Sequence, residues 1–319
     1  MARCKTRFVR IRISCLVALS AASCDRCVEP VPLSSDAAYD APPVDAEVRD
    51  ALVDASVADV AADAKGDAER AASCPLGMAL VTLAEPARES AYCIDRYEAY
   101  VVVVEPDGRE RPHSPYSVVE GATFRAKVAA NVVPQAYVSQ VAAARACKNA
   151  SKRLCKKEEF ERACRGPDDA NLYPYGGAER IKGYCNEGKG SSIPAKYGTD
   201  PAKWTFKDFN DPELNQWRGK LAKTGEHARC VSPYGVFDLV GNLHEWGDDA
   251  PDGKGRARFR GGWYGDAEVN GHGCAYVTKA HEPTYHDYST GFRCCKDALY
   301  VDAPLGDEAG KAQNRAPNE

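Results

Sequence analysis

Oxygen-bearing side chains are closely spaced in one short stretch of the chain, GVFDLVGNLHEWGDD (residues 235–249). Asp238, Asn242 and Glu245 lie among apolar residues there, and no single helix or strand period fits the pattern. Side chains of this kind at this spacing could hold a bound group. They could equally cap turns by accepting hydrogen bonds from backbone amides, as aspartate and asparagine commonly do. The stretch therefore predicts either a binding site or a set of capped turns.

Histidine and cysteine are the other side chains that could bind a metal. His272, His281 and His286 could gather iron or copper, although histidines on loops are usually only solvated. The chain has 14 cysteines, and those from Cys74 onward number ten, enough for five disulfides with no thiol left over. Structural zinc is disfavoured because no two CxxC pairs occur in this part of the sequence. This cysteine usage predicts export to an oxidising compartment.

Other common site patterns are not recognisable in the sequence. No Ser-His-Asp order stands out, and no glycine-rich loop follows a strand to hold a phosphate. The formal net charge of the chain is −4, and its imbalance lies mainly in the N-terminal part. The remainder is nearly neutral and has no basic stripe, which argues against a nucleic-acid partner.

Two helices are expected among the elements that position these residues. The first covers residues 138–150 and is rich in alanine, which allows its backbone to lie close to a neighbour. The second covers residues 156–165 and places Phe160, Ala163 and Cys164 on one face, followed by a glycine that can end it. Cys164 is therefore expected to face the interior.

Strands are expected at residues 78–83, 92–104 and 258–263, where β-branched or aromatic residues partly alternate with polar ones. Long loops rich in Gly, Asp and Lys separate them, at residues 166–211 and 248–255. So much irregular structure in one domain predicts that disulfides or bound ions brace it.

The N-terminal part has the pattern of an export signal. Residues 1–23 begin with basic side chains, continue with an apolar run too short to span a bilayer, and end in small residues. Cys24 follows directly, as at the cleavage site of a bacterial lipoprotein, so we expect Cys24 to be lipidated; ordinary secretion is the alternative.

An acidic segment separates this signal from the folded part. Residues 24–73 carry aspartates at short intervals and few aromatic residues, which predicts a disordered tether, or locally an alanine-rich helix. The folded domain is expected to span residues 74–300, and residues 301–319 are expected to form a disordered tail.

Seven blocks within residues 74–296 occur in an order that resembles the formylglycine-generating enzymes, also called sulfatase-modifying factors. The blocks are YCIDRYEAY, KRLCKKEEFERACRG, YPYG, CN, GVFDLVGNLHEW, RFRGGW and GFRCC. This resemblance implies an α+β domain with an irregular C-type-lectin-like fold, few helices, small twisted antiparallel sheets and disulfide bracing.

The resemblance also implies disulfide pairs. Cys147 would pair with Cys294, and Cys164 with Cys274. Cys74 with Cys93 is our own expectation, because both lie near the starts of adjacent predicted strands. The four remaining cysteines are left to pair among themselves: Cys155, Cys185, Cys230 and Cys295.

Calcium is implied at the opening stretch, because members of the family bind Ca²⁺ there through side-chain and backbone oxygens. The matching ligands would be Asp238, Asn242, the carbonyl of Leu243, and Glu245. A second family calcium site would use Asn186, but His227 stands where its acidic ligand is expected. Imidazole is a poor calcium ligand, so this second site is not expected.

Copper is not expected, because the active enzymes hold it between two thiolates that this chain lacks. The matching interval, WYGDAEVNGHG (residues 263–273), contains no cysteine, and Tyr264 and Val269 fall at or near the two positions. Trp263 replaces the serine of the family's GGS block and would place a large ring at the mouth of the substrate groove. Whether the chain is an enzyme is therefore left open.

The expected function is a non-catalytic binding or scaffold module, anchored at the cell envelope by a lipid, with an unknown protein or glycan partner. One alternative is an active formylglycine-generating enzyme or related oxidoreductase with a rearranged site. Another is a glycan-binding lectin-like module, for which Trp204, Trp217 and Tyr264 could supply exposed aromatic rings.

Overall fold

The strands form several small sheets in the computed structural model, which describes residues 71–83 and 91–301. One four-stranded sheet has the order β2-β3-β12-β7 and is antiparallel throughout. Its strands are β2 (Met78–Thr82), β3 (Ala91–Asp95), β7 (Arg153–Leu154) and β12 (Cys294–Asp297). It joins residues near both ends of the described domain. At its centre, β3 is largely buried, and Cys294 and Cys295 of β12 are buried.

A second four-stranded sheet carries the residues of the opening stretch. Its order is β10-β9-β8-β11. The strands are β8 (His244–Trp246), β9 (Ala257–Arg260), β10 (Val277–His281) and β11 (Thr290–Gly291). β11 pairs with β8 in parallel, with Thr290 opposite His244. This pairing brings two segments together that are far apart in sequence.

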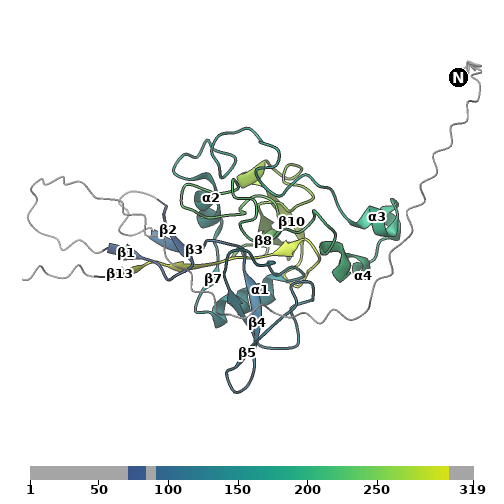
Figure 1. Cartoon of the computed structure of the whole chain (residues 1–319), viewed down its shortest axis with the longest axis horizontal. Helices are drawn as coiled ribbons and strands as arrows, with labels where there is room; N and C mark the ends of the chain where they lie inside the picture. Colours follow the sequence, from purple (N-terminus) through teal and green to yellow (C-terminus); the bar gives the residue numbers. More distant parts are fainter. Residues whose placement is uncertain (1–70, 84–90, 302–319) are drawn as a thin grey trace, which may run out of the picture. The chain divides into compact units, whose positions relative to one another are not determined.

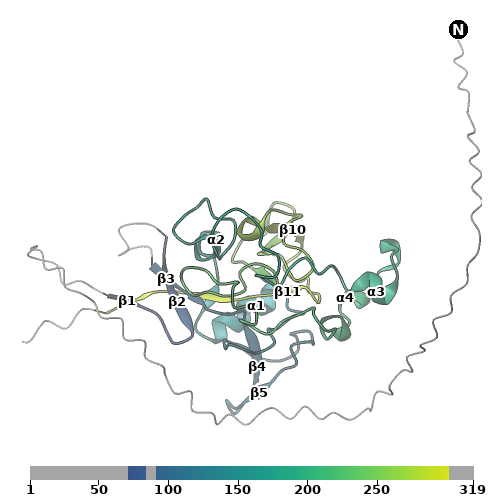
Figure 2. The same cartoon turned by 45° about the horizontal axis from the view of Figure 1, so that its top comes forward.

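Two smaller sheets complete the strand pairing of the described residues. β4 (Tyr100–Val104) lies between β5 (Glu110–Pro112) and β6 (Phe124–Lys127). β1 (Ala71–Ser73) pairs antiparallel with β13 (Leu299–Val301). In both views, β1 and β13 lie at one end of the domain and α3 and α4 at the other (Figures 1 and 2).

The two expected helices are present. α1 (Gln140–Asn149) begins after Ser139, whose hydroxyl accepts a hydrogen bond from the Ala142 amide at 3.2 Å. α2 (Lys157–Arg165) ends at a glycine and buries Phe160, Ala163 and Cys164, the face predicted from the sequence. Short helices lie in the long loop between α2 and β8: α3 (Ile193–Tyr197), α4 (Phe206–Phe209) and the 3₁₀ turns Pro201–Lys203 and Pro212–Asn215. A further 3₁₀ turn covers Gly273–Ala275. The predicted α+β fold with few helices is confirmed.

Two of the predicted strands have different limits. The strand expected at residues 92–104 was wrong as one element, because the chain leaves one sheet after β3 and enters another at β4. Between them the buried Glu98 turns its carboxylate toward Asn242. The strand expected at residues 258–263 ends at Arg260, because Gly261 and Gly262 both have positive φ angles that interrupt an extended strand. β1 lies before the boundary predicted at residue 74 and pairs with β13.

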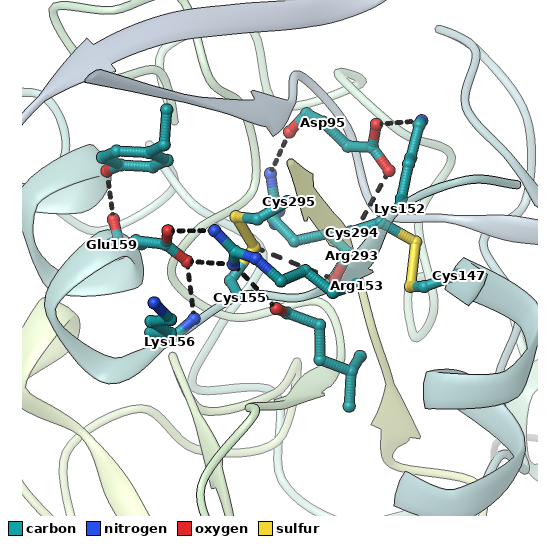
Figure 3. Close-up of a disulfide and its surroundings, with 12 residues drawn as sticks. Asp95, Cys147, Lys152, Arg153, Cys155, Lys156, Glu159, Arg293, Cys294 and Cys295 are labelled. Carbon is teal, nitrogen blue, oxygen red and sulfur yellow. Dashed lines mark hydrogen bonds and ion pairs between the residues drawn. A yellow bond between two sulfur atoms is a disulfide. The ribbon is translucent and has the colours of Figure 1, made fainter. Parts of the chain in front are cut away.

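Five disulfides join all ten cysteines of the described domain. The structure pairs Cys147 with Cys294, Cys164 with Cys274, and Cys74 with Cys93, as named from the sequence. The remaining four form Cys155–Cys295 and Cys185–Cys230. Two bridges therefore hold neighbouring residues of β12, one to α1 and one to the residue before the cap of α2 (Figure 3).

These disulfides fit an exported protein in an oxidising compartment. Among the described residues, no helix has both the length and the apolar character needed to cross a membrane. The predicted signal, the predicted lipidation site at Cys24, the acidic segment up to residue 70 and the predicted tail after residue 301 lie outside the described residues.

Candidate functional site

The oxygen cluster of the opening stretch is buried and largely satisfied by protein groups. Asn242 has a φ angle of 58°, and its Oδ1 accepts hydrogen bonds from Asn186 Nδ2 (2.7 Å) and the Ala222 amide (3.0 Å). Its Nδ2 donates to Glu98 Oε2, and Glu98 Oε1 accepts from the Leu243 amide at 3.0 Å. Gly241 makes this packing possible, because a Cβ there would lie 2.2 Å from the carbonyl oxygen of Asn186. The side chain of Asn242 therefore ties three segments together.

A single guanidinium supplies the positive charge at the centre of this cluster. Arg293 Nε and Nη2 each donate to one oxygen of Glu245, both at 2.6 Å, in a bidentate pair that is almost completely buried. Arg293 also donates to the carbonyls of Asp95 (3.1 Å) and Phe237 (2.9 Å). Its donors are thus shared between a carboxylate and backbone carbonyls of distant segments.

The carboxyl groups near Arg293 have raised pKa values, because they are buried and Arg293 alone does not balance their charge. The pKa of Glu98 lies well above its ordinary value, first because of burial and then because of the charges of Asp238 and Glu245. Burial likewise raises the pKa of Asp238 to about 7, while its Oδ2 accepts a hydrogen bond from the Gly225 amide at 2.7 Å. The cluster carries an excess of acidic groups over its one buried arginine.

The donor set does not favour a calcium ion. Ca²⁺ needs about six to eight oxygen ligands, whereas both oxygens of Glu245 accept from Arg293 and Asn242 Oδ1 already accepts two hydrogen bonds. In residues 71–83 and 91–301, no three His, Cys, Asp or Glu side chains gather as a metal site would. Asn186 Oδ1 is a buried oxygen with no hydrogen-bond partner in the described part of the chain, but one oxygen does not make such a site. Arg293 stands where the resemblance would place a cation, and calcium binding stays a prediction from that resemblance.

Removal of calcium by a chelator tests whether this cluster binds the ion. We expect the melting temperature of the purified chain to be unchanged, within about 1 °C, when excess EGTA is added or when calcium is restored, because Arg293 already pairs with both oxygens of Glu245 and Asn242 Oδ1 already accepts two hydrogen bonds. Differential scanning calorimetry measures this directly. A fall of several degrees in EGTA that calcium reverses and magnesium does not would establish a calcium site here.

The residues that align with the copper ligands do not form a metal site. Tyr264 is completely buried, and its hydroxyl lies 3.4 Å from Ser192 Oγ, whereas Val269 is 81% exposed on a loop. The expectation of an exposed Tyr264 as a glycan-binding ring was wrong, because this ring packs against Trp263 and Tyr288. Two of the histidines considered for a metal each have a partner of their own. His272 pairs with Glu268, and His286 Nδ1 lies within hydrogen-bond distance of Asn210 Oδ1.

A cavity of about 510 Å³ opens beside Trp263. Aromatic side chains form much of its walls, and they come from α4, from β9 and the segment between β9 and β10, and from the loop between β10 and β11. These rings are Phe206, Phe209, Phe259, Trp263, Tyr276, Tyr285 and Tyr288. The ring of Trp263 stands nearly perpendicular to that of Tyr288, with centroids 5.2 Å apart. A cavity of this size with apolar walls suits a small ligand.

A chain of polar side chains lies along the same cavity. Asp287 Oδ1 accepts a hydrogen bond from Ser289 Oγ (2.7 Å), and Ser289 Oγ lies 3.2 Å from His244 Nδ1. His244 Nε2 is 3.4 Å from the hydroxyl of Tyr276. Burial lowers the pKa of His244 to about 3, so its ring is neutral at pH 7 and serves as a hydrogen-bonding wall.

The sequence did not identify these polar residues as a group. His244 was part of the opening stretch but had no assigned role, and Asp287 and Ser289 belong to no motif. They meet because β11 pairs in parallel with β8, which places the Ser289 carbonyl 2.8 Å from the His244 amide. Of the three histidines considered as metal ligands from the sequence, His281 lines the cavity, where its ring stacks on Tyr285 with centroids 3.8 Å apart. No local sequence signal could have found this arrangement.

The fold and its irregular, disulfide-braced loops define the class of protein. Residues 89–298 match the family described as sulfatase-modifying factor enzyme 1-like domain. The match covers more than half of the chain, so this chain belongs to that family.

The solved structures that this chain is similar to are distant from it. PvdO from Pseudomonas aeruginosa is 14% identical, with a TM-score of 0.38 over 73% of this chain and 100% of its own. CarF is 15% identical, with a TM-score of 0.40 over 70% of this chain and 98% of its own. The U1 variant of the major tropism determinant is 17% identical, with a TM-score of 0.39 over 73% of this chain and 55% of its own. Among curated proteins, none matches this chain.

Proposed function

We propose that this protein is a non-catalytic binding module of the sulfatase-modifying factor family, and that the aromatic cavity beside Trp263 is its ligand site. One observation carries the proposal: all ten cysteines of the described domain are in disulfides, so none of them offers a thiolate to copper. The aligned positions hold Tyr264 and Val269 instead. Neither of these two side chains can supply a thiolate to copper.

The proposed setting is the cell envelope, with a lipid on Cys24 and the acidic segment as a flexible tether. The disulfides support export, and the signal pattern and the cysteine after it support the anchor. Mass spectrometry of the protein purified from membranes would report acyl chains on Cys24 and the bridge pattern together. An N-terminal peptide without acyl chains would argue for ordinary secretion.

Oxidation of a cysteine peptide tests the absence of catalysis. We expect the purified chain, supplied with copper(I), O₂ and a thiol reductant that provides the remaining two electrons, to leave the thiol of a sulfatase-derived cysteine peptide unchanged, while an active formylglycine-generating enzyme converts it under the same conditions. Copper binding at one ion per chain, measured after dialysis by atomic absorption, should also be missing. Formation of the aldehyde product, which lacks the peptide's sulfur, would overturn the proposal in favour of a rearranged oxidoreductase site.

A further inference from the structure

One carboxylate in the aromatic cavity has only neutral partners. Asp287 is 6% exposed and lines the cavity. Its Oδ1 accepts from the Ser289 amide (2.8 Å) and Ser289 Oγ (2.7 Å), and its Oδ2 accepts from the Tyr285 hydroxyl (2.6 Å). No lysine or arginine within residues 71–83 and 91–301 forms an ion pair with it. A buried carboxylate in this setting favours a positively charged neighbour.

The histidines around the cavity do not supply that charge at neutral pH. Burial lowers the pKa of His281 against the opposing charge of Asp287, and it lowers the pKa of His286 against the opposing charges of Glu120 and Asp287. His244 is neutral for the same reason. The negative charge of Asp287 is therefore available to a ligand.

Aromatic side chains line the same open cavity. Phe206 lies 5.9 Å from Tyr285 between ring centroids, and Trp263 packs edge to face on Tyr288. A ring whose face is open to the cavity attracts a cation through its negative potential, most strongly when the cation is weakly hydrated.

The polar atoms in the cavity limit which cation fits. An unmethylated ammonium brings three N–H donors that need acceptors. The hydroxyls, the imidazole and Asp287 already bond to one another along the wall. A methylated ammonium needs little hydrogen bonding, loses little hydration and makes contact with the rings through its methyl groups.

We propose that the cavity binds a small organic cation, a methylated or quaternary ammonium group, with Asp287 as its counter-ion and the aromatic rings as its cage. This inference rests on the proposed function, because it assigns the ligand class of the same cavity. The group could belong to a free metabolite or to a methylated lysine of a protein partner, since both present the same chemistry.

Titration calorimetry of the full chain with two matched ligands tests the role of charge. Choline and 3,3-dimethylbutan-1-ol have nearly the same shape, but only choline is charged. We expect choline to bind at least about tenfold more tightly. Equal affinity for choline and the neutral alcohol would overturn the inference. So would the absence of choline binding at the highest choline concentration used.

Variants then assign the effect to named side chains. Asp287→Asn should weaken choline binding at least about tenfold and leave the neutral isostere unchanged. Phe206→Leu keeps an apolar side chain at a position that is 53% exposed, and should weaken choline by about two- to fivefold. Asp107→Asn, on an exposed carboxylate, is the matched control and should bind like the wild type. If Asp287→Asn does not fold, as judged by circular dichroism, the wild-type comparison of the two ligands still decides.

A peptide arm distinguishes the two sources. If a trimethyllysine peptide binds at least about tenfold more tightly than both choline and the unmethylated peptide, the site is assigned to a modified protein partner. If choline and the trimethyllysine peptide bind equally, the site is assigned to a free small cation. Either result supports the inference, whereas tighter binding of the unmethylated peptide would contradict it. The oxidation assay measures a different property from ligand binding. If choline does not bind, the proposal that the protein is non-catalytic still stands. If the aldehyde forms, that proposal fails, whatever the result with choline.

Discussion

Replacing Arg293 by alanine is expected to cost about 3 to 5 kcal/mol of folding free energy, enough to unfold much of the protein at 37 °C. The substitution would leave Glu245 buried with neither oxygen paired, next to Glu98 and Asp238, whose pKa values burial already raises. It would also remove donors from the carbonyls of Asp95 and Phe237. Urea denaturation followed by tryptophan fluorescence measures the loss.

Arg109→Ala is the matched control for this prediction. Arg109 is exposed and pairs with Asp107, which is also exposed, so its loss should leave the urea midpoint nearly unchanged. The double variant Arg293→Met/Glu245→Gln should recover part of the lost stability, because no unpaired charge then remains on either partner. A stable Arg293→Ala variant would contradict the argument, and stabilisation of that variant by calcium would show that an ion can take over the role of the guanidinium.

Loss of both disulfides on β12 is expected to be much more damaging than loss of either one. Cys147–Cys294 and Cys155–Cys295 close loops with sequence separations of 147 and 140 residues, which overlap almost completely. With one bridge intact, opening the other frees only a short residual loop, so each single removal should cost about 3 kcal/mol. Removing the second bridge then opens the long loop and should cost about 5 kcal/mol more.

Serine pairs at these positions test this non-additivity by urea denaturation in a double-mutant cycle. The sum of the two single effects should fall short of the effect of the fourfold serine variant by about 2 kcal/mol. Cys74–Cys93, with a separation of 19 residues, closes a loop of its own and is the control that should add independently. Strict additivity of the two β12 bridges would show that local packing, rather than loop closure, sets their contribution.

The elements whose signal is local were the ones predictable from the sequence. α1 and α2 carry their caps and their buried faces within the helices themselves, at Ser139, Phe160 and Cys164. The strand from residue 92 was predicted too long, because β-branched residues continue past the point where Glu98 turns inward. Strand propensity does not record which sheet a residue joins.

The candidate site depended on contacts that sequence spacing does not contain. Asp287, Ser289 and His244 meet only through the parallel pairing of β8 with a two-residue strand, an element too short to have a pattern. The family resemblance located the loss of the copper-binding cysteines and gave Trp263 a place near the site. It could not show that Phe206, from a short helix in a long loop, would close the other side of the same cavity.

The pairing of β1 with β13 has a mechanical consequence for a protein held by its N-terminal segment. With Cys24 anchored as proposed, a pull transmitted from the membrane would first load three residue pairs, those of Ala71, Ala72 and Ser73 with β13. Cys74 follows at once and is covalently joined to Cys93 in the central strand β3. Peeling would stop at that bond, and the tension would pass into the buried sheet while the rest of the domain kept its shape.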